Sequence, residues 1–392
     1  MTVATKDVPA TSPLDLPEEL QLLQRTVRQF VEEQLQPHEM EIEERSEIPR
    51  ALLDAIAAMG FFGIGFPEDV GGQGFGKLGY VVMVEQLARV NAAVWNVVGA
   101  SIGLCATAIS LGADDAQKRR FLPDLLSAKR IGAYALSEPG AGSDAGSLRA
   151  RARREGDGYV LDGAKTFITN APIADDFVVF ANVDPDAGSK GITAFLVARD
   201  TPGLRIGPSD EKMGLHGSTT AQIFFDGMRV GADRRLGDEG RGFPLALKTL
   251  DHGRLGLAAS SVGAAQRLLE ASIAYARTRK QFGKPIAVNQ AIQWMIADGA
   301  TGIHAARLMA YDAALRLDRG ERITQRAAMA KLFATEHLGR VADNAVQIHG
   351  GMGYMSELWI ERAYRDARIA RIYEGTSEIQ RSVIAQSLLE ER

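Results

Sequence analysis

Cysteine and histidine are scarce in this chain of 392 residues. It contains one cysteine, Cys105, and six histidines. A single cysteine excludes an internal disulfide framework and a cysteine-based metal cluster. The histidines are scattered and form no His-Glu-x-x-His pair, so we expect no metal site.

Long apolar runs and an excess of positive charge are also missing. The apolar runs are shorter than the roughly 20 residues of a membrane-spanning helix. The 45 Lys and Arg residues stand against 49 Asp and Glu, so no bulk attraction to nucleic acid or to an anionic membrane is expected. Residues 1–16 contain Pro9 and Pro13 but no hydrophobic stretch, which predicts no signal peptide and a mobile tail over the first dozen residues. The expected location is the cytoplasm.

Hydrophobic residues make up 46% of the chain, which is enough for a large core, and the length suggests two or three domains. The first domain is expected at residues 1–130 and reads as helical. Apolar residues at helical spacing follow Pro17, and Pro37 should kink or end that helix. A long buried helix is predicted over 79–112, and another over 114–127.

The middle of the chain has the texture of a β module, expected at residues 131–238. Short runs rich in Val, Ile and Phe alternate with Gly and Asp turns, which is typical of strands and hairpins. The predicted strands include Tyr159–Leu161, Phe177–Val183, Ile192–Ala198 and Gln222–Phe225.

Helical texture returns in the last region, residues 239–392. Four helices are predicted, over 242–276, 288–318, 322–348 and 377–390, and short connections favour a bundle. Strands and helices do not alternate, which disfavours a doubly wound sheet. The predicted class is therefore α+β: an N-terminal helical domain, a middle β-barrel-like domain and a C-terminal four-helix bundle.

A glycine-rich string, Tyr134–Asp144, stands at the junction between the first helices and the strands. It lacks the βαβ setting and the later acidic residue of a Rossmann fingerprint. Its backbone N–H groups and the Ser137 and Ser143 hydroxyls could still bind a phosphate or a polar ring edge. An ordinary turn that opens a strand explains the string equally well.

Three further segments allow both a structural and a functional interpretation. Phe167–Asn170 is either plain β core or an aromatic and a Thr that cover a flat ring. Arg277–Pro285 is either a basic helix end or a pyrophosphate site centred on Arg279. Gln347–Tyr354 is either a helix stop or a backbone that approaches a cofactor closely.

The last segment, Arg371–Gln380, contains a carboxylate just before a helix. Ser377 and Gln380 have capping-box spacing, so we expect the helix to begin there. Glu374 is then either a surface group that complements the helix dipole or a general base in a pocket, with Gly375 leaving room for a substrate.

Together these motifs resemble the acyl-CoA dehydrogenase family. The matching strings are Ser-Glu-Pro-Gly-Ala-Gly-Ser-Asp, Thr-Asn after an aromatic, Arg-x-x-Phe-Gly, Gln-x-x-Gly-Gly and Tyr-Glu-Gly-Thr-Ser-Glu-Ile-Gln. The resemblance covers residues 17 to 390. It implies a three-domain fold, a bound FAD, and removal of two hydrogens across Cα–Cβ of an acyl-CoA thioester.

The resemblance also implies roles for single residues. Glu374 falls on the position of the catalytic base. The acyl and CoA path would be lined by Ser143, Asp251, Arg254 and Gly375. Other positions would bind FAD within one chain: Tyr134, Leu136, Ser137, Gly142, Ser143, Phe167, Thr169, Thr376 and Glu378. A second set would bind the ADP half of FAD from across a subunit interface: Arg279, Gln281, Phe282, Asn289, Gln290, Gln347, Gly350 and Gly351.

Three positions separate this chain from parts of the family. Phe167 stands where the family usually has Trp. A minority branch has its base at the place of Gly253, which cannot act as one, so Glu374 has no competitor. Trp95 aligns with an arginine that binds dicarboxylic acyl groups, which argues against a charged acyl tail.

The expected partners are an acyl-CoA, an electron-transferring flavoprotein as acceptor, and further copies of the chain in a homotetramer. Two alternatives remain open at this level. One is an oxidase-like flavoenzyme that passes electrons to O2. The other is a non-catalytic relative that binds DNA or protein, against which the retained Glu374 and the lack of a basic tail count.

Overall fold

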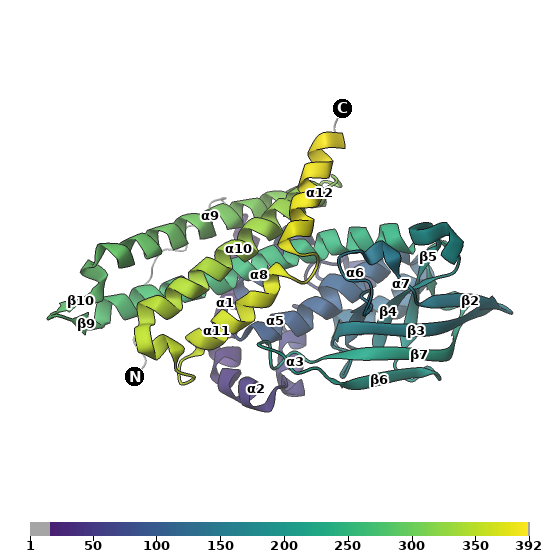
Figure 1. The fold of residues 1–392 in the computed structure, drawn as a ribbon, viewed down its shortest axis with the longest axis horizontal. Helices are drawn as coiled ribbons and strands as arrows, with labels where there is room; N and C mark the ends of the chain where they lie inside the picture. Colours follow the sequence, from purple (N-terminus) through teal and green to yellow (C-terminus); the bar gives the residue numbers. More distant parts are fainter. Residues whose placement is uncertain (1–15, 391–392) are drawn as a thin grey trace.

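Three regions of different secondary structure follow one another along the chain (Figure 1). The computed structural model describes residues 16–390, so the tail expected over the first dozen residues lies outside the described part. Helices run from residue 18 to 126, strands from 132 to 236, and mainly helices again from 242 to 390. This order confirms the predicted α+β class.

The N-terminal helices begin where the apolar spacing places them. In the first, Leu20, Leu23 and Val27 are buried at intervals of one turn, and the helical path ends in a short turn around Pro37. The α-helices of this region are α1 (Glu18–Phe30), α2 (Glu39–Arg45), α3 (Arg50–Ala58), α4 (Gly76–Leu87), α5 (Ala92–Val98), α6 (Thr107–Gly112) and α7 (Asp115–Leu126), with a π-helical stretch, η4 (Gly99–Ala106), between α5 and α6.

The prediction of one continuous helix over 79–112 is wrong. The chain breaks between α4 and α5, where the Asn91 side chain accepts a hydrogen bond of 2.9 Å from the Ala93 N–H and so starts a new helix. The stretch Ala92–Gly112 is long and apolar enough to cross a membrane, contrary to the expectation of shorter runs, but 78% of its most apolar 18-residue window is buried inside the protein. It is a core element that shapes the cavity described below.

The middle region is an eight-stranded mixed sheet. Its order is β6-β7-β3-β2-β4-β5-β8, with β1 parallel to β4, so the barrel-like domain is open at β6 and β8. Only one residue pair, Arg151 with Asn182, joins β2 to β4, and the sheet divides there into two halves. The strands are β1 (Gly132–Ala135), β2 (Arg151–Glu155), β3 (Gly158–Thr169), β4 (Asp176–Asn182), β5 (Ile192–Ala198), β6 (Leu204–Ser209), β7 (Thr220–Gly231) and β8 (Arg235–Leu236).

Strand β4 is buried on both faces, which explains its uninterrupted apolar run. Phe177 and Val179 point into the core of the sheet domain, whereas Val178 and Phe180 point into the core shared with the helices. Alternate side chains of one strand thus attach the sheet to the helical region. Asn170 also connects the sheet to the helical region, because its Nδ2 donates hydrogen bonds to the carbonyl oxygens of Val97 and Gly132 at 2.9 and 3.0 Å.

The C-terminal region contains the four predicted helices and one more. The predicted set is α8 (Gly242–Thr278), α9 (Gln290–Asp318), α10 (Thr324–His349) and α12 (Ser377–Glu390); α11 (Trp359–Ala367) was not expected. Figure 1 shows α8, α9 and α10 extending away from the sheet. A small hairpin, β9 (Lys280–Gln281) with β10 (Lys284–Pro285), lies at their far end.

A buried polar cluster joins the first helical region to the bundle. Glu85 of α4 accepts hydrogen bonds from Arg307 Nε and from the Tyr311 hydroxyl of α9, each at 3.0 Å.

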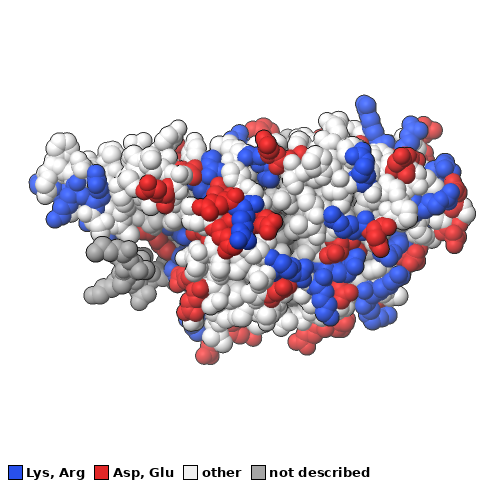
Figure 2. All heavy atoms as spheres, turned by 90° about the horizontal axis from the view of Figure 1, so that it is seen from below, with Lys and Arg blue, Asp and Glu red and all other residues white. Residues whose placement is uncertain are grey.

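Acidic and basic side chains are interspersed on the face of the molecule drawn in Figure 2.

Candidate active site

A cavity of about 660 Å³ lies where α4, η4 and α8 meet the loop after β1 and the turn before α12. Its volume is in the range of small-molecule sites. Ten of the residues proposed from the sequence line it: Tyr134, Leu136, Ser137, Gly142, Ser143, Phe167, Thr169, Arg254, Glu374 and Gly375.

The cavity follows one side of α8. Phe243, Leu247, Leu250, Arg254 and Leu257, spaced by three or four residues, line it over about 21 Å of helix at 1.5 Å per residue. The end beside Leu247 is exposed and the end beside Leu257 is buried. The cavity is therefore a channel with an open mouth and a closed end.

Glu374 lies near the closed end, in the turn between η10 (Arg368–Arg371) and α12. Its φ is +56° and that of Gly375 is +93°, so two successive residues are left-handed. For a glutamate this conformation is unfavourable and is kept only where the surroundings hold it. A side-chain carbon on Gly253 would collide with the Glu374 carboxylate, so glycine at that position makes room for the acid.

Three buried donors hold this turn through its carbonyl oxygens. Arg254 Nε donates to the Glu374 oxygen at 3.2 Å, and Lys331 Nζ donates to the Gly375 oxygen at 2.8 Å. The Gln380 side-chain amide donates to both oxygens, at 3.2 and 3.0 Å. These contacts offset the backbone strain and leave the Glu374 side chain free to face the cavity.

The Glu374 carboxylate has an unusual electrostatic setting. Its Oε2 is buried without a hydrogen-bond partner among the described residues. Burial raises the pKa of Glu374 to about 7, against the opposing charges of Lys331 and Arg254. Burial lowers the pKa of Lys331 to about 8, against the charge of Glu374. A carboxylate with a pKa near neutrality can act as a general base.

The glycine-rich loop is anchored by a buried ion pair. Lys165 Nζ lies 2.8 Å from Glu138 Oε1, and the Glu138 carboxylate also accepts the backbone N–H groups of Arg149 and Ala150 at 2.7 and 3.0 Å. Burial lowers the pKa of Lys165 to about 8, against the charge of Glu138. Glu138 of the Ser-Glu-Pro string thus has a structural role and shapes the loop from beneath.

The loop leaves open space where a ligand would lie. A side-chain carbon on Gly142 would meet nothing within 4 Å and would project into the cavity that this residue lines. Opposite the loop, Phe167 is 73% exposed with φ +57°, an unfavourable state for an aromatic residue. The Phe167 ring and the space beside Gly142 fit the flat ring system of FAD, and Ser137, Ser143 and Thr169 supply hydroxyls in the same lining.

Asp251, expected along the acyl and CoA path, does not line the cavity. Its carboxylate accepts Arg254 Nη1 at 2.9 Å and the Thr324 hydroxyl at 2.7 Å. It thus lies behind Arg254 and orients the guanidinium toward the Glu374 turn.

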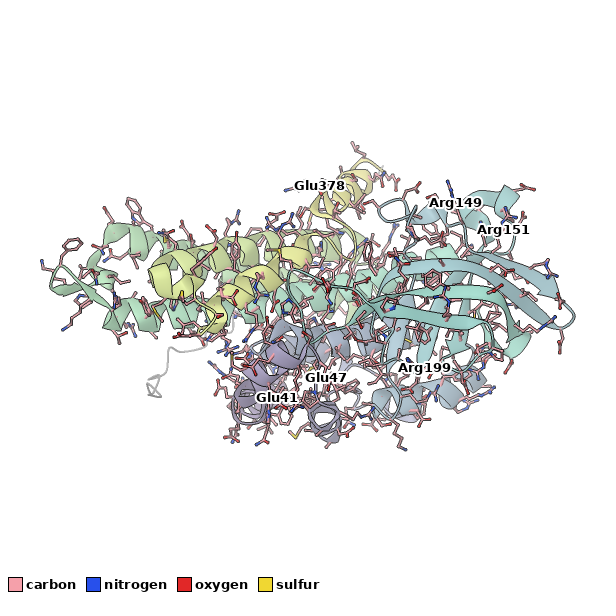
Figure 3. The ribbon with its side chains drawn as sticks, turned by 60° about the horizontal axis from the view of Figure 1, so that its bottom comes forward. Glu41, Glu47, Arg149, Arg151, Arg199 and Glu378 are labelled. Atoms are coloured by element: carbon pink, nitrogen blue, oxygen red, sulfur yellow. The ribbon has the colours of Figure 1, made fainter. Side chains whose placement is uncertain are left out.

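The start of α12 also differs from the prediction. The capping box of Ser377 and Gln380 is not formed, because the Ser377 hydroxyl donates to Glu336 at 2.6 Å and Gln380 holds the Glu374 turn. Thr376 accepts the Ile379 N–H at 3.4 Å instead. Glu378 is exposed on α12. Figure 3 shows Glu378 on this helix, and Arg149 and Arg151 on the sheet domain.

The remaining residues proposed for FAD lie at the far end of the bundle. Thr278, the last residue of α8, is about 38 Å along the helix from Gly253. None of these residues lines the cavity, and Phe282 is fully exposed with φ +51°. They gather around the β9–β10 hairpin and the end of α10: Arg279, Gln281, Phe282, Asn289, Gln290, Gln347, Gly350 and Gly351.

Several functional candidates were missed from the sequence. Lys331 interrupts an alanine-rich helix face that includes buried Ala327 and Ala334, a signal for a buried charge that could have been noticed. Tyr80 and Lys165 resemble ordinary core or strand residues. Trp95, noted from the sequence at the place of a carboxylate-binding arginine, does line the cavity. Within residues 16–390, no group of three or more His, Cys, Asp or Glu residues is placed to hold a metal ion.

Comparison with known proteins identifies the family of the chain. Models of the acyl-CoA dehydrogenase N-terminal, middle and C-terminal domains match residues 17–129, 133–228 and 240–389. The caffeyl-CoA reductase-Etf complex subunit CarC of Acetobacterium woodii is 43% identical, over 95% of this chain and 98% of that protein. The human mitochondrial short-chain specific acyl-CoA dehydrogenase is 42% identical, over 96% of this chain and 91% of that protein.

A solved structure shows the same architecture. Butyryl-CoA dehydrogenase from Megasphaera elsdenii superposes with a TM-score of 0.94 at 39% identity, over 96% of this chain and all of that one. Identity of this extent over the whole length, with all three domain models matched in order, goes beyond a shared fold. The chain belongs to the acyl-CoA dehydrogenase family.

Proposed function

We propose that Glu374 is the catalytic base of an FAD-dependent acyl-CoA dehydrogenase. The observation that carries this assignment is Oε2 of Glu374, a buried carboxylate oxygen without a hydrogen-bond partner among the described residues, on a side chain that lines the cavity. In that position it would take a proton from Cα of a bound thioester. Glu374 is also held at its backbone, so the carboxylate keeps one position during the transfer.

An α-proton of a thioester is a weak acid, so the developing negative charge on the thioester oxygen needs a donor. None of the described residues accepts a hydrogen bond from the Glu374 N–H, which leaves it available for that oxygen. A donor of this kind typically lowers the activation free energy by about 3–4 kcal/mol. Arg254 and Lys331 keep the turn, and therefore this N–H, in place.

The cavity residues fit the isoalloxazine half of FAD, which when bound accepts the hydride from Cβ at its N5 atom. Phe167 would cover the ring, and Gly142 would let the ring approach the loop. Ser137, Ser143 and Thr169 would donate or accept hydrogen bonds at its polar edge. Ser143 would also contact the CoA side of the substrate at the mouth.

The residues at the far end of α8 would bind the adenine half of FAD from a second copy of the chain. Thr278 lies about 38 Å along α8 from Gly253, farther than an FAD molecule extends, so one chain cannot use both groups on one cofactor. Exposed apolar side chains near this end support an interface, among them Phe282, Trp294 and Tyr354. These observations support an assembly of more than one copy, and we propose four copies because the family resemblance implies a homotetramer.

Replacement of Arg279 by Ala tests the shared cofactor site. The variant should keep its fold and lose FAD more readily on dilution, because a charge-assisted contact to phosphate is missing. Size-exclusion chromatography with light scattering gives the copy number. A stable monomer loaded with FAD would contradict the assignment of the second group.

The Glu374→Gln variant tests the catalytic base directly. It should bind FAD and acyl-CoA and lose about 100- to 10,000-fold in turnover, because the amide cannot take the proton. Glu357→Gln, on an exposed site away from the cavity, is the matched control and should retain full turnover. Near-normal turnover by Glu374→Gln would remove Glu374 from this role.

We propose an electron-transferring flavoprotein as the acceptor, since a relative is named as a subunit of a reductase-Etf complex. That name also makes the reverse reaction, reduction of an enoyl thioester, a second candidate that uses the same residues. Anaerobic bleaching of the flavin by an acyl-CoA, followed by oxygen uptake and by reoxidation with enoyl-CoA, separates dehydrogenase, oxidase and reductase.

We also propose that the protein is located in the cytoplasm.

A further inference from the structure

Tyr80 lines the closed end of the cavity, and no described residue forms a hydrogen bond with its hydroxyl. The Tyr80 hydroxyl is buried and has no hydrogen-bond partner, and the side chain is only 3% exposed. An unpaired buried hydroxyl costs about 1–3 kcal/mol, whereas phenylalanine would fill the same space at no such cost.

Two glycines make room for this hydroxyl. A side-chain carbon on Gly103 would lie 2.8 Å from the Tyr80 oxygen, and one on Gly256 would lie 2.6 Å from it. The ring itself is held by Trp95, whose ring centroid lies 6.1 Å away in an edge-on arrangement. The hydroxyl therefore has a defined position at the end of the channel.

That position lies one helical turn beyond the catalytic base. Gly253, which adjoins the Glu374 carboxylate, and Gly256, which adjoins the Tyr80 hydroxyl, are three residues apart on α8. Residues at this spacing present neighbouring side-chain positions about 5–6 Å apart. An acyl group whose Cα lies at Glu374 thus reaches the Tyr80 hydroxyl within a few bonds.

The closed end is otherwise neutral. Trp95, Leu104 and Leu257 line it with Gly99 and Gly103, and no charged side chain lies among them. A phenol both donates and accepts hydrogen bonds, which suits an uncharged oxygen rather than a carboxylate.

We propose that the Tyr80 hydroxyl binds an uncharged oxygen atom on the γ or δ carbon of a short acyl thioester, so that the preferred substrate is a short oxygenated acyl-CoA. This inference rests on the proposed function, because it takes the cavity to hold an acyl thioester with Cα at Glu374. It assigns Tyr80 a part in substrate specificity, with the reaction itself unchanged.

The test compares substrates of equal length on the FAD-loaded enzyme. 4-Hydroxybutanoyl-CoA and pentanoyl-CoA differ by a hydroxyl in place of a methyl group. The wild-type enzyme should favour the hydroxy substrate in kcat/KM by about 10-fold, and Tyr80→Phe should bring this ratio close to one. Gly256→Ala, which crowds the hydroxyl, should also lower the ratio. Tyr311→Phe makes the same chemical change at a hydroxyl that binds Glu85 and should leave the ratio unchanged.

Two outcomes would overturn the inference: a ratio that Tyr80→Phe does not alter, or an equal loss for both substrates, which would place Tyr80 behind Glu374 instead. Dissociation constants of the two thioesters, measured with Glu374→Gln and with Glu374→Gln/Tyr80→Phe, do not depend on turnover. A binding preference that disappears with the Tyr80 hydroxyl would support the inference even if the enzyme dehydrogenated neither thioester, a result that would count only against the proposed function.

Discussion

Lys331 Nζ donates a hydrogen bond of 2.8 Å to the carbonyl oxygen of Gly375, the residue after the proposed base. The lysine comes from the first third of α10, is fully buried, and is the first of the two cations that oppose the high pKa of Glu374. One side chain therefore influences both the shape of the turn and the charge state of the carboxylate.

Replacement of Lys331 separates these two effects. Lys331→Met removes the donor and the charge, so kcat/KM near neutral pH should fall by about 10- to 100-fold, and the pKa that governs it should rise. Lys331→Gln keeps a donor without the charge and should lose less while shifting the pKa in the same direction. The measurement is the pH profile of kcat/KM for each variant. Two unshifted profiles would show that Lys331 acts only through packing.

The pKa of Glu374, about 7, predicts how the wild-type enzyme depends on pH. Below this value the carboxyl group is protonated and cannot accept a proton, so kcat/KM should be low in acid and rise as the pH increases through about 7. An exposed glutamate, with a pKa near 4.5, would give a flat profile over that range. Steady-state kinetics between about pH 5.5 and pH 8 decide between the two.

Gly140 and Gly142 provide a matched pair for cofactor binding. A side chain at either position would meet nothing within 4 Å, but only Gly142 lines the cavity. Gly142→Val should therefore lose bound FAD, because its side chain occupies the space of the ring, and Gly140→Val should keep it. Flavin absorbance per protein chain measures this difference. Equal FAD content in the two variants would exclude the glycine-rich loop as the ring site.

The buried pair of Lys165 and Glu138 predicts a large effect on stability. Lys165→Met leaves a buried carboxylate without its cation and should lower the free energy of unfolding by about 3–5 kcal/mol. The double variant Lys165→Met/Glu138→Gln removes both charges and should recover part of this loss. Urea denaturation followed by fluorescence compares the three proteins. A single variant as stable as the wild type would mean that the pair is not needed to hold the loop.

Local sequence patterns predicted most of the secondary structure. The strands and the long helices follow from alternating or helical spacing of apolar residues and from glycine and aspartate at turns, which act over a few neighbouring residues. The break at Ala88–Asn91 was missed because no proline or glycine marks it. Helix α11 was missed because it has only nine residues and its buried side includes the charged residues Arg362 and Asp366, which hide the apolar spacing.

The residues of the candidate site also fall into those that local sequence patterns could identify and those that depend on contacts between remote segments. Glu374, Gly375 and the glycine-rich loop could be proposed because each belongs to a contiguous string. Lys331 could be suspected only as a buried charge, since the Gly375 oxygen that it binds lies 44 residues away. Tyr80 gives no such signal, because the glycines beside its hydroxyl belong to other helices. Asp251 was assigned to the substrate path because the resemblance placed the stretch from Asp251 to Arg254 along it; only the packing shows that its carboxylate binds Arg254 and Thr324 instead.

The order of residues along the chain determined the helical and β regions, the string that carries the carboxylate, and the family to which the protein belongs. Only the packing of α4, α8 and α10 around the turn at Glu374 decided which side chains surround that carboxylate, how far burial raises its pKa, and which hydroxyl closes the cavity beyond it. The physical reason is that solvent exclusion and hydrogen-bond geometry depend on distances between segments remote in the chain, whereas secondary-structure patterns depend on near neighbours.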